Sequence, residues 1–246
     1  MKNINIVFSL FFVGCSSSLP DASLPLADHL KIGMDFMDQE EFVKAQDEFK
    51  FILARGTGTD YGDDAQFFLA ESYFLNEQYM LSIPEYENLT RKMAYSPFFE
   101  KARFRICEAY RIESPNYYND QSYTKKALER YREFLDEFPE TEHSKTVSKS
   151  MSVLRNKLAK KLYETGILYI KMDEFEPARM SFNQILDLYY DTNVIENVHY
   201  EIIKSYLKQG DDKTAKSYWI NKGKNFIKQE KLVLELNEIF SQEELQ

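Results

Sequence analysis

Three scarcities in this chain of 246 residues each exclude a class of protein. It has two cysteines, Cys15 and Cys107, which are too few for a disulfide framework. It has eight glycines and seven prolines, which leaves little room for sheets and hairpin turns, so the expected fold class is all-α. Its apolar run at residues 4–13 is too short to cross a hydrocarbon core of ~30 Å as a helix.

Catalytic and metal-binding motifs are also absent from the sequence. There is no H-E-x-x-H, G-x-S-x-G or G-x-x-x-x-G-K-[ST] segment. Residues 56–62 imitate a dinucleotide loop, but their glycine spacing is one residue too long, so we expect a turn. His29 and His199 occupy equivalent positions in the repeat described below, which favours packing over metal binding. The sequence therefore predicts no enzymatic activity, no cofactor and no metal.

The charge balance argues against nucleic acid as a partner. Asp and Glu number 40 against 31 Lys and Arg, which gives a formal net charge of −9 at pH 7. A surface that follows a phosphate backbone needs the opposite balance. We therefore expect no nucleic acid partner.

A four-residue skeleton recurs five times and dominates the sequence. It consists of a residue that is usually small, an aromatic three places on, an Ala or Ser about twelve places after the first residue, and a second aromatic four places beyond. Such self-similarity predicts stacked helix pairs, in which the small residue lets two helices approach closely and the first aromatic fills the space between them. The copies are Gly33, Phe36, Ala45, Phe49; Ala70, Tyr73, Ser82, Tyr86; Cys107, Tyr110, Ala127, Tyr131; Gly166, Tyr169, Ala178, Phe182; and Ile203, Tyr206, Ala215, Trp219.

This pattern resembles the tetratricopeptide repeat. The first residues of the copies are separated by steps of 37, 37, 59 and 37 residues, slightly longer than the ~34 of the consensus repeat. The resemblance implies a helical solenoid of about five helix pairs with a carboxy-terminal capping helix, whose function comes from its surface. Cys107 occupies the small position of the third copy, so we expect it to pack rather than to react.

Two irregular segments interrupt the repeats. Ala127 lies 17 places after Tyr110, where the other copies have 9, and the extra piece at 112–124 contains Ser114-Pro115-Asn116 and three tyrosines. Pro and Asn predict a loop, which either contacts partners or is a longer turn covered by its own tyrosines. Residues 144–165 contain no Pro or Gly and predict a long helix that continues to Met172, roughly 40 Å in length.

The amino terminus resembles a bacterial lipoprotein signal peptide. A short basic start, the apolar run and Val13-Gly14-Cys15 carry this resemblance. It implies cleavage before Cys15, lipid attachment on Cys15 and a polar tether after it. Ser16 stands where an inner-membrane retention signal has Asp, which favours the periplasmic face of the outer membrane. The alternatives are an ordinary secretory signal peptide or an apolar tail on a cytosolic protein.

Three segments resemble one family, the BamD/ComL lipoproteins of outer-membrane β-barrel assembly. They are Asp120-Gln121, residues 131–141 (YREFLDEFPET) and residues 154–159 (LRNKLA) on the expected long helix. The resemblance implies a non-enzymatic subunit whose carboxy-terminal repeats bind a BamA-like POTRA protein, beside other assembly subunits. It also implies that the amino-terminal repeats receive unfolded outer-membrane proteins. The alternative is a periplasmic repeat lipoprotein that scaffolds cell-envelope or peptidoglycan machinery.

The inner wall of the amino-terminal repeats is the expected substrate-peptide groove. Extended peptides lie along the first helices of tetratricopeptide pairs, and here that wall is apolar and aromatic, which suits a peptide with aromatic side chains. The alternative is that these side chains are core. The expected groove residues are Leu30, Met34, Met37, Phe67, Phe74 and Phe104.

The carboxy-terminal repeats carry the expected partner-binding surface. Seven lysines lie between residues 204 and 228 of an acidic chain, and a basic, aromatic end can steer an acidic partner domain. Alternatively, the lysines coat solvated helix faces and Trp219 is core. The expected partner-binding residues are Arg155, Lys157, Lys204, Lys208 and Trp219.

The sequence predicts five segments. They are a lipoprotein signal peptide at 1–14, the lipidated Cys15 and tether at 15–26, repeats 1–3 with the loop insertion 112–124 at 27–143, the long helix with repeats 4–5 at 144–229, and a capping helix or tail at 230–246.

Overall fold

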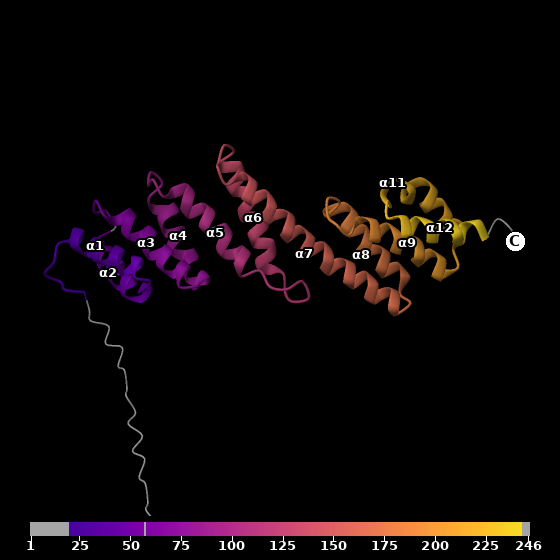
Figure 1. Cartoon of the computed structure of the whole chain (residues 1–246). Coiled ribbons are helices and arrows are strands. Elements are labelled where there is room, and N and C mark those ends of the chain that lie inside the picture. Colours follow the sequence, from indigo (N-terminus) through magenta and orange to yellow (C-terminus); the bar gives the residue numbers. More distant parts are fainter. Residues whose placement is uncertain (1–19, 57, 243–246) are drawn as a thin grey trace, which may run out of the picture. The chain divides into compact units, whose positions relative to one another are not determined.

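The computed structural model describes residues 20–56 and 58–242, in which every regular element is a helix (Figure 1). The predicted all-α, tetratricopeptide-like fold class is therefore confirmed. Cys15 and the segment predicted to be a signal peptide lie outside the described residues. The helices are α1 (Leu26–Asp38), α2 (Phe42–Arg55), α3 (Gly62–Leu75), α4 (Tyr79–Lys92), α5 (Phe99–Ile112), α6 (Ser122–Glu137), α7 (Ser144–Lys171), α8 (Phe175–Leu188), α9 (Ile195–Gln209), α10 (Asp212–Tyr218), the π-helix η1 (Trp219–Gly223), α11 (Lys224–Phe226) and α12 (Glu230–Gln242).

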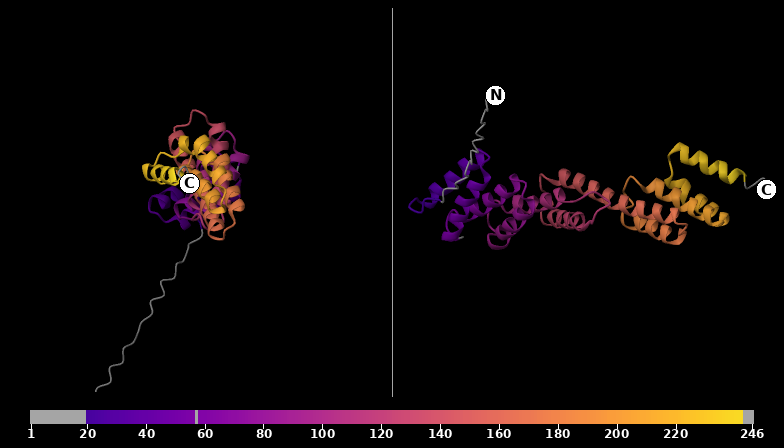
Figure 2. Two further views of the ribbon diagram at one scale, coloured as in Figure 1. Left: turned by 90° about the vertical axis from the view of Figure 1, so that its right-hand side faces the viewer. Right: turned by 90° about the horizontal axis from the view of Figure 1, so that it is seen from below.

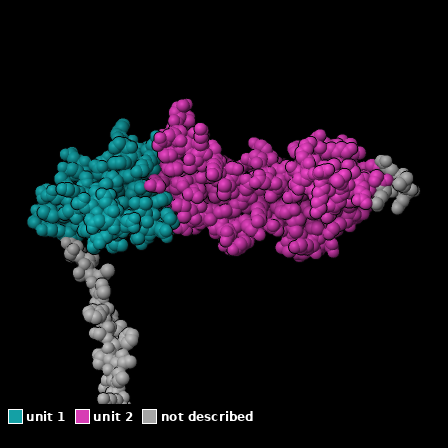
Figure 3. All heavy atoms as spheres, in the orientation of Figure 1, with its two compact units in different colours: residues 1–102 teal, residues 103–246 magenta. Residues whose placement is uncertain are grey.

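The helices form two compact units, Met1–Ala102 and Arg103–Gln246 (Figure 3). In the first unit α1 packs on α2, α2 on α3 and α3 on α4. In the second, α7 contacts both α6 and α8, and α8 also contacts α9. The sequence placed a boundary after residue 143, whereas the structure keeps the third pair with the fourth. The reason is that Val147, Leu154 and Leu158 of α7 share a core cluster with Tyr131 and Phe134 of α6.

One turn joins the two helices of four pairs. A residue with a positive φ lies one or two places beyond the first helix, and the amide of the next residue donates to the carbonyl of the first skeleton aromatic, which is the Schellman arrangement. Glu41, Gln78, Glu174 and Asp211 donate to Phe36, Tyr73, Tyr169 and Tyr206. The left-handed residues are Glu40, Glu77, Asp173 and Gly210, with φ of 58°, 57°, 58° and 80°. The skeleton aromatics thus recur where the chain reverses.

The small residue of the skeleton faces the second aromatic. A Cβ atom added at Gly33 would lie 2.6 Å from Phe49 Cε1, and one added at Gly166 would lie 2.4 Å from Phe182 Cε1. Phe49 and Phe182 are fully buried. The ring that fills the space between the helices is therefore that of the second aromatic. The prediction from the spacing, that the first aromatic fills this space, is wrong. The reason is that the side chain of the second aromatic points straight at the bare glycine backbone of the opposite helix.

The third and last pairs depart from this scheme. The insertion is a loop at 113–121, because α5 continues to Ile112 and the first turn of α6 takes residues 122–124. The predicted long helix is confirmed as α7, and the predicted capping helix as α12. In the fifth pair the first skeleton residue is Ile203, which shares a core cluster with Trp219, and an added Cβ at Gly223 would lie 2.5 Å from Trp219 Cε3. Both Figures 1 and 2 show α12 beside this end of the second unit, where Leu236 and Phe240 join the cluster of Ile203 and Trp219.

We expect Gly166→Ala to destabilise the chain by about 1–3 kcal/mol, the usual cost of overpacking a core. The gain in helix propensity, at most about 1 kcal/mol, is smaller because the buried Phe182 ring cannot move aside. The matched control is Gly58→Ala, since an added Cβ at Gly58 has nothing within 4 Å. Urea denaturation followed by circular dichroism measures both, and equal midpoints for the two variants would contradict the close approach.

Candidate binding surfaces

The expected groove residues of the first copy lie on α1 and are half-buried. Leu30, Met34 and Met37 pack against the cluster of Phe49, Ile52 and neighbouring side chains in the first unit. A long flexible Met at the edge of a core leaves part of its surface to solvent and adapts to different contacts. These three residues keep a partly accessible apolar strip on α1.

Phe67 and Phe74 are core residues rather than groove residues. Phe67 is fully buried and stacks on Phe98 with ring centroids 4.3 Å apart, and Phe74 is 8% exposed against Tyr79. The expectation of a groove wall failed here because α3 is packed on two sides, by α2 and by α4, which bury apolar residues on more than one of its faces. Phe104 belongs to the second unit, where its half-buried ring stacks on His143 at 4.0 Å.

Arg155 is held inside the second unit. Its Nε lies 3.0 Å from both carboxylate oxygens of Asp191, and its Nη2 donates to the carbonyl of Leu188. This contact lowers the pKa of Asp191 below its usual range. The pair ties the middle of α7 to the turn after α8, so its geometry supports a structural role for Arg155.

Lysines of α7 hold the insertion loop against that helix. Lys157 Nζ donates to the carbonyl and hydroxyl oxygens of Ser114, and Lys161 Nζ donates to the carbonyl of Asn119 at 2.6 Å. Gln121 closes the loop from within, because its amide donates to the carbonyls of Asn116 and Asn119. Burial lowers the pKa of Lys157. The loop is thus an ordered platform whose side chain Tyr118 is 66% exposed.

A pocket of about 240 Å³ lies where this loop meets α7 and α8. Its floor is apolar, formed by Leu158, Leu162 and Tyr189, and its rim carries Lys125 and Lys161. Asp120 shares the rim, where its carboxylate accepts from the amide of Ser122 at the start of α6. The sequence predicted the loop but not the pocket, because one wall of the pocket comes from Gln184 of α8, which is distant from the loop in sequence.

The carboxy-terminal lysines divide into packed and exposed residues. Lys204 Nζ lies 5.0 Å from the centroid of the Tyr200 ring and is half-buried, whereas Lys208 is exposed. Trp219 is 4% exposed in a core cluster, so the core alternative holds for it. An indole buried this deeply offers no contact area to a partner. The exposed lysines of this end are Lys208, Lys213, Lys222, Lys224 and Lys228.

Three pairs of hydrogen-bonded polar side chains, with a constant sequence separation, were not predicted from the sequence. His29 pairs with Glu48, Gln66 with Glu85 and His199 with Tyr218, each partner 19 residues on. Burial and nearby Lys222 lower the pKa of His199 to about 4, so this ring is neutral at ordinary pH. The expectation that both histidines pack is confirmed, and the equal spacing was the signal that could have revealed their partners.

The tyrosines among the second aromatics also have dedicated partners. The Tyr86 hydroxyl donates to Glu71 at 2.5 Å, and that of Tyr131 donates to Glu108. Glu occurs directly after the first skeleton residue in these two copies, whereas the copies with Phe have Met34 or Ile167 there. A buried phenol needs a hydrogen-bond partner and a buried phenyl ring does not, which explains the pairing.

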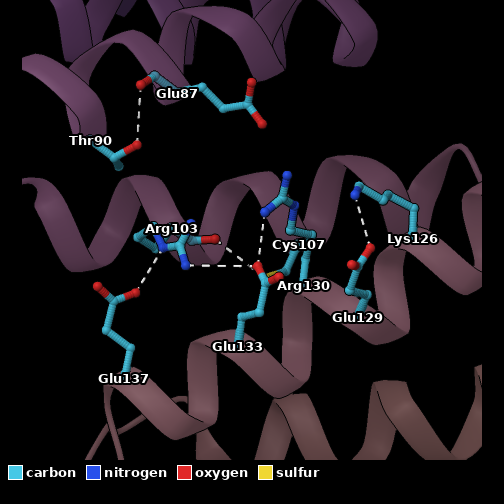
Figure 4. Close-up of polar contacts among 9 residues, drawn as sticks. All are labelled: Glu87, Thr90, Arg103, Cys107, Lys126, Glu129, Arg130, Glu133 and Glu137. Atoms are coloured by element: carbon cyan, nitrogen blue, oxygen red, sulfur yellow. Dashed lines mark hydrogen bonds and ion pairs between the residues drawn. The ribbon is translucent and has the colours of Figure 1, made fainter.

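Charged contacts join α5 to α6 around Cys107 (Figure 4). Arg103 Nε donates to Glu137 at 2.8 Å, and Arg103 Nη2 lies 3.9 Å from Glu133, which also accepts from Arg130 within α6 at 2.8 Å. Cys107 is 1% exposed and burial raises the pKa of its thiol to about 12, so it packs and stays protonated, as expected. No group of His, Cys, Asp and Glu within residues 20–56 and 58–242 could hold a metal ion. No helix in the same part of the chain has the length and hydropathy needed to cross a bilayer.

The comparison with protein families follows the same features. A family model described as YfiO, outer membrane lipoprotein, matches residues 27–175, which span the first three pairs, the insertion loop and α7. The chain belongs to the YfiO family. The match covers more than half of the sequence and includes both segments where the repeat pattern breaks.

Two relatives of this YfiO member carry a functional name. A protein from Rickettsia prowazekii (strain Madrid E), named outer membrane protein assembly factor BamD, is 26% identical over 230 residues, covering 90% of this chain and 89% of the relative. The BamD of Caulobacter vibrioides is 21% identical over 196 residues, covering 79% of this chain and 64% of the relative. Among solved structures, a tetratricopeptide repeat protein from Parabacteroides merdae is similar over 80% of this chain and 66% of its own chain. The sequence identity is 16% and the TM-score is 0.39, and a TM-score this low supports no functional argument.

We expect Lys157→Met to release the insertion loop from α7. The variant keeps the apolar stem but removes both hydrogen bonds to Ser114, so amides at 113–121 should exchange with deuterium roughly tenfold faster, as local opening becomes easier. Lys145→Met, an exposed lysine on the same helix, is the control and should leave these amides unchanged. Unaltered exchange in Lys157→Met, measured by mass spectrometry, would show that the loop holds itself in place.

Proposed function

We propose that the chain is a lipid-anchored subunit of the machinery that assembles outer-membrane proteins and that it acts by binding rather than by catalysis. The family match over residues 27–175 carries this proposal, because it includes the insertion loop and the long helix, which a generic tetratricopeptide protein lacks. The names of both relatives support the same role. The site of action is the periplasmic face of the outer membrane.

The carboxy-terminal repeats bind an acidic, POTRA-bearing insertion protein in this proposal. Seven lysines and only two aspartates lie between residues 204 and 228, and five of the lysines are exposed. Such a local excess speeds association with an acidic surface and sets its orientation. Arg155 and Trp219 act here through structure, since one is paired with Asp191 and the other is buried.

Unfolded outer-membrane proteins are the proposed substrates of the amino-terminal repeats. The half-buried strip of Leu30, Met34 and Met37 on α1 is the part of the expected groove that remains partly accessible. Apolar side chains with a flexible thioether suit segments of varied sequence. Phe67 and Phe74 support this strip from the core and do not touch substrate in this arrangement.

Co-purification from detergent-solubilised membranes tests the proposal. Full-length protein should bring a POTRA-bearing outer-membrane protein with it, and Lys208→Glu/Lys213→Glu/Lys222→Glu should lower the recovered amount about tenfold at low salt. Lys31→Glu/Lys92→Glu, which changes exposed lysines of the first unit, is the matched control and should recover the normal amount. Recovery of cell-wall enzymes without any POTRA protein would contradict the proposal and favour the envelope scaffold.

The lipid anchor has a separate test at Cys15. Cys15→Ser removes the acylated thiol, so the protein should move from the membrane pellet to the soluble fraction, because two or three acyl chains supply the stable attachment. Labelling with radioactive palmitate should mark the wild type and not the variant. Equal labelling of both proteins would contradict lipid attachment at Cys15. The Cys107→Ser variant is the control and should be labelled like the wild type.

A further inference from the structure

One stripe of side chains runs the whole length of α7. Its positions are separated alternately by four and three residues, a spacing that keeps side chains on one side of a helix. The first half consists of Val147, Met151, Leu154 and Leu158. The second half, which we call the exposed stripe, consists of Lys161, Thr165, Leu168 and Met172.

The two halves of the stripe have opposite environments. In the first half, Val147, Leu154 and Leu158 are at most 5% exposed and pack in the cluster formed with α6. In the exposed stripe, Leu168 is 57% exposed and Met172 is 59% exposed. The side of α7 that α6 covers near its start is thus exposed to solvent at its last two positions, which are the apolar Leu168 and Met172, whereas Lys161 and Thr165 are half-buried.

Equivalent positions elsewhere in the chain show what normally covers this place. Leu168 lies two residues after Gly166, as Ser72 lies two after Ala70 and Ser205 two after Ile203. Both serines are 0% exposed, because α2 packs on α3 and α8 packs on α9. In the second case Arg179 of α8 donates to the Ser205 hydroxyl at 3.2 Å and to Gln209 at 2.9 Å. In both cases the second helix of the preceding pair covers the serine.

The residue at this position differs in α7. The buried equivalents are small (Ser72, Ala109 and Ser205, all 0% exposed), whereas Leu168 is a large apolar residue that is exposed. On α1, the first helix of the described chain, the corresponding positions are Asp35 and Gln39, both exposed. Within the part of the chain that the structure describes, this exposed side is therefore polar at α1 and carries the apolar Leu168 and Met172 at α7. Exposed apolar residues in register with a buried stripe mark a surface that another helix covers.

The pocket at the insertion loop lies at the junction of the two halves of the stripe. Its charged residues indicate the charge of a partner that would bind there. Leu158, the last buried residue of the stripe, and Lys161, the first residue of the exposed stripe, both line it. Lys125, which is exposed, and Lys161 make the rim more basic than acidic, with Asp120 as the opposing charge. An acidic side chain at this end of an incoming helix complements the two lysines.

We propose that an amphipathic helix of a partner protein docks along the exposed stripe, in the place that the second helix of a preceding pair occupies elsewhere in this chain. Apolar side chains spaced three and four residues apart on the partner contact Leu168 and Met172, and one enters the pocket above Leu158. An acidic residue of the partner lies beside Lys125 and Lys161. The inference does not depend on which assembly the protein serves.

Site-specific photo-crosslinking in intact membranes tests the location. The full-length chain carries p-benzoylphenylalanine at position 168 or, as a control, at position 153. Val153 is on the same helix, outside the stripe, and is 58% exposed, so the two probes are equally accessible. The probe at 168 should give one adduct with a partner protein that the probe at 153 does not give. Mass spectrometry of the adduct should place the attached residue in a segment with apolar residues at three- and four-residue spacing.

A synthetic peptide of the cross-linked segment then tests the contact itself. Leu168→Glu/Met172→Glu in the full-length protein should weaken its binding by about tenfold or more, because two apolar contacts become charged. Val153→Glu should leave the affinity unchanged, and a normal helical spectrum for each variant shows that the fold is kept. An adduct with a second copy of this chain, an adduct on an extended segment, equal adducts from positions 168 and 153, or unchanged affinity in the double variant would each overturn the proposal.

Discussion

The close approach of two helices at a bare backbone position governs this structure. At Gly33 and Gly166 the ring of a buried phenylalanine sits where a Cβ atom would otherwise lie. That contact fixes the distance within a pair and the rotation of each helix, and so decides which side chains remain for the next pair. Where the aromatic is a tyrosine, the same packing needs a buried carboxylate, and Glu71 and Glu108 supply it. The Schellman turn recurs because the first helix of each of these pairs must end at the same distance beyond its contact with the second helix.

The irregular third pair creates the surfaces that distinguish this chain from a uniform solenoid. Because α7 is long enough to serve two pairs, its first half completes the third pair and its second half begins the fourth. The distance between these pairs opens the pocket beside Tyr189 and uncovers Leu168 and Met172. Lysines of α7 also hold the insertion loop in a defined conformation. A single long helix therefore accounts for the loop platform, the pocket and the exposed stripe.

The chain belongs to the YfiO family, and the proposal that it acts by binding directs attention to its surfaces. Its buried polar groups serve the structure, because His199 is neutral and Cys107 is protonated, and nearer the surface Arg155 pairs with Asp191. The candidate binding surfaces instead lie outside the core, at the α1 strip, the exposed carboxy-terminal lysines and the second half of α7. These candidate surfaces lie on different helices and share no residue.

Much of the fold was predictable from the spacing of small and aromatic residues, because local periodicity reflects which side of a helix is buried. The spacing predicted helix pairs, α7, α12, the loop after α5 and the packing of His29 and His199. It did not show that α3 is covered on both sides, so Phe67 and Phe74 were expected in a groove and are found in the core. Nor did it show which basic side chains form hydrogen bonds within the fold, since the partners of Lys157 and Arg155 lie more than 30 residues away in sequence. The sequence by itself determined the repeating helical unit and its family; tertiary structure decided which apolar and charged side chains reach solvent, because exposure depends on neighbours that are distant in sequence.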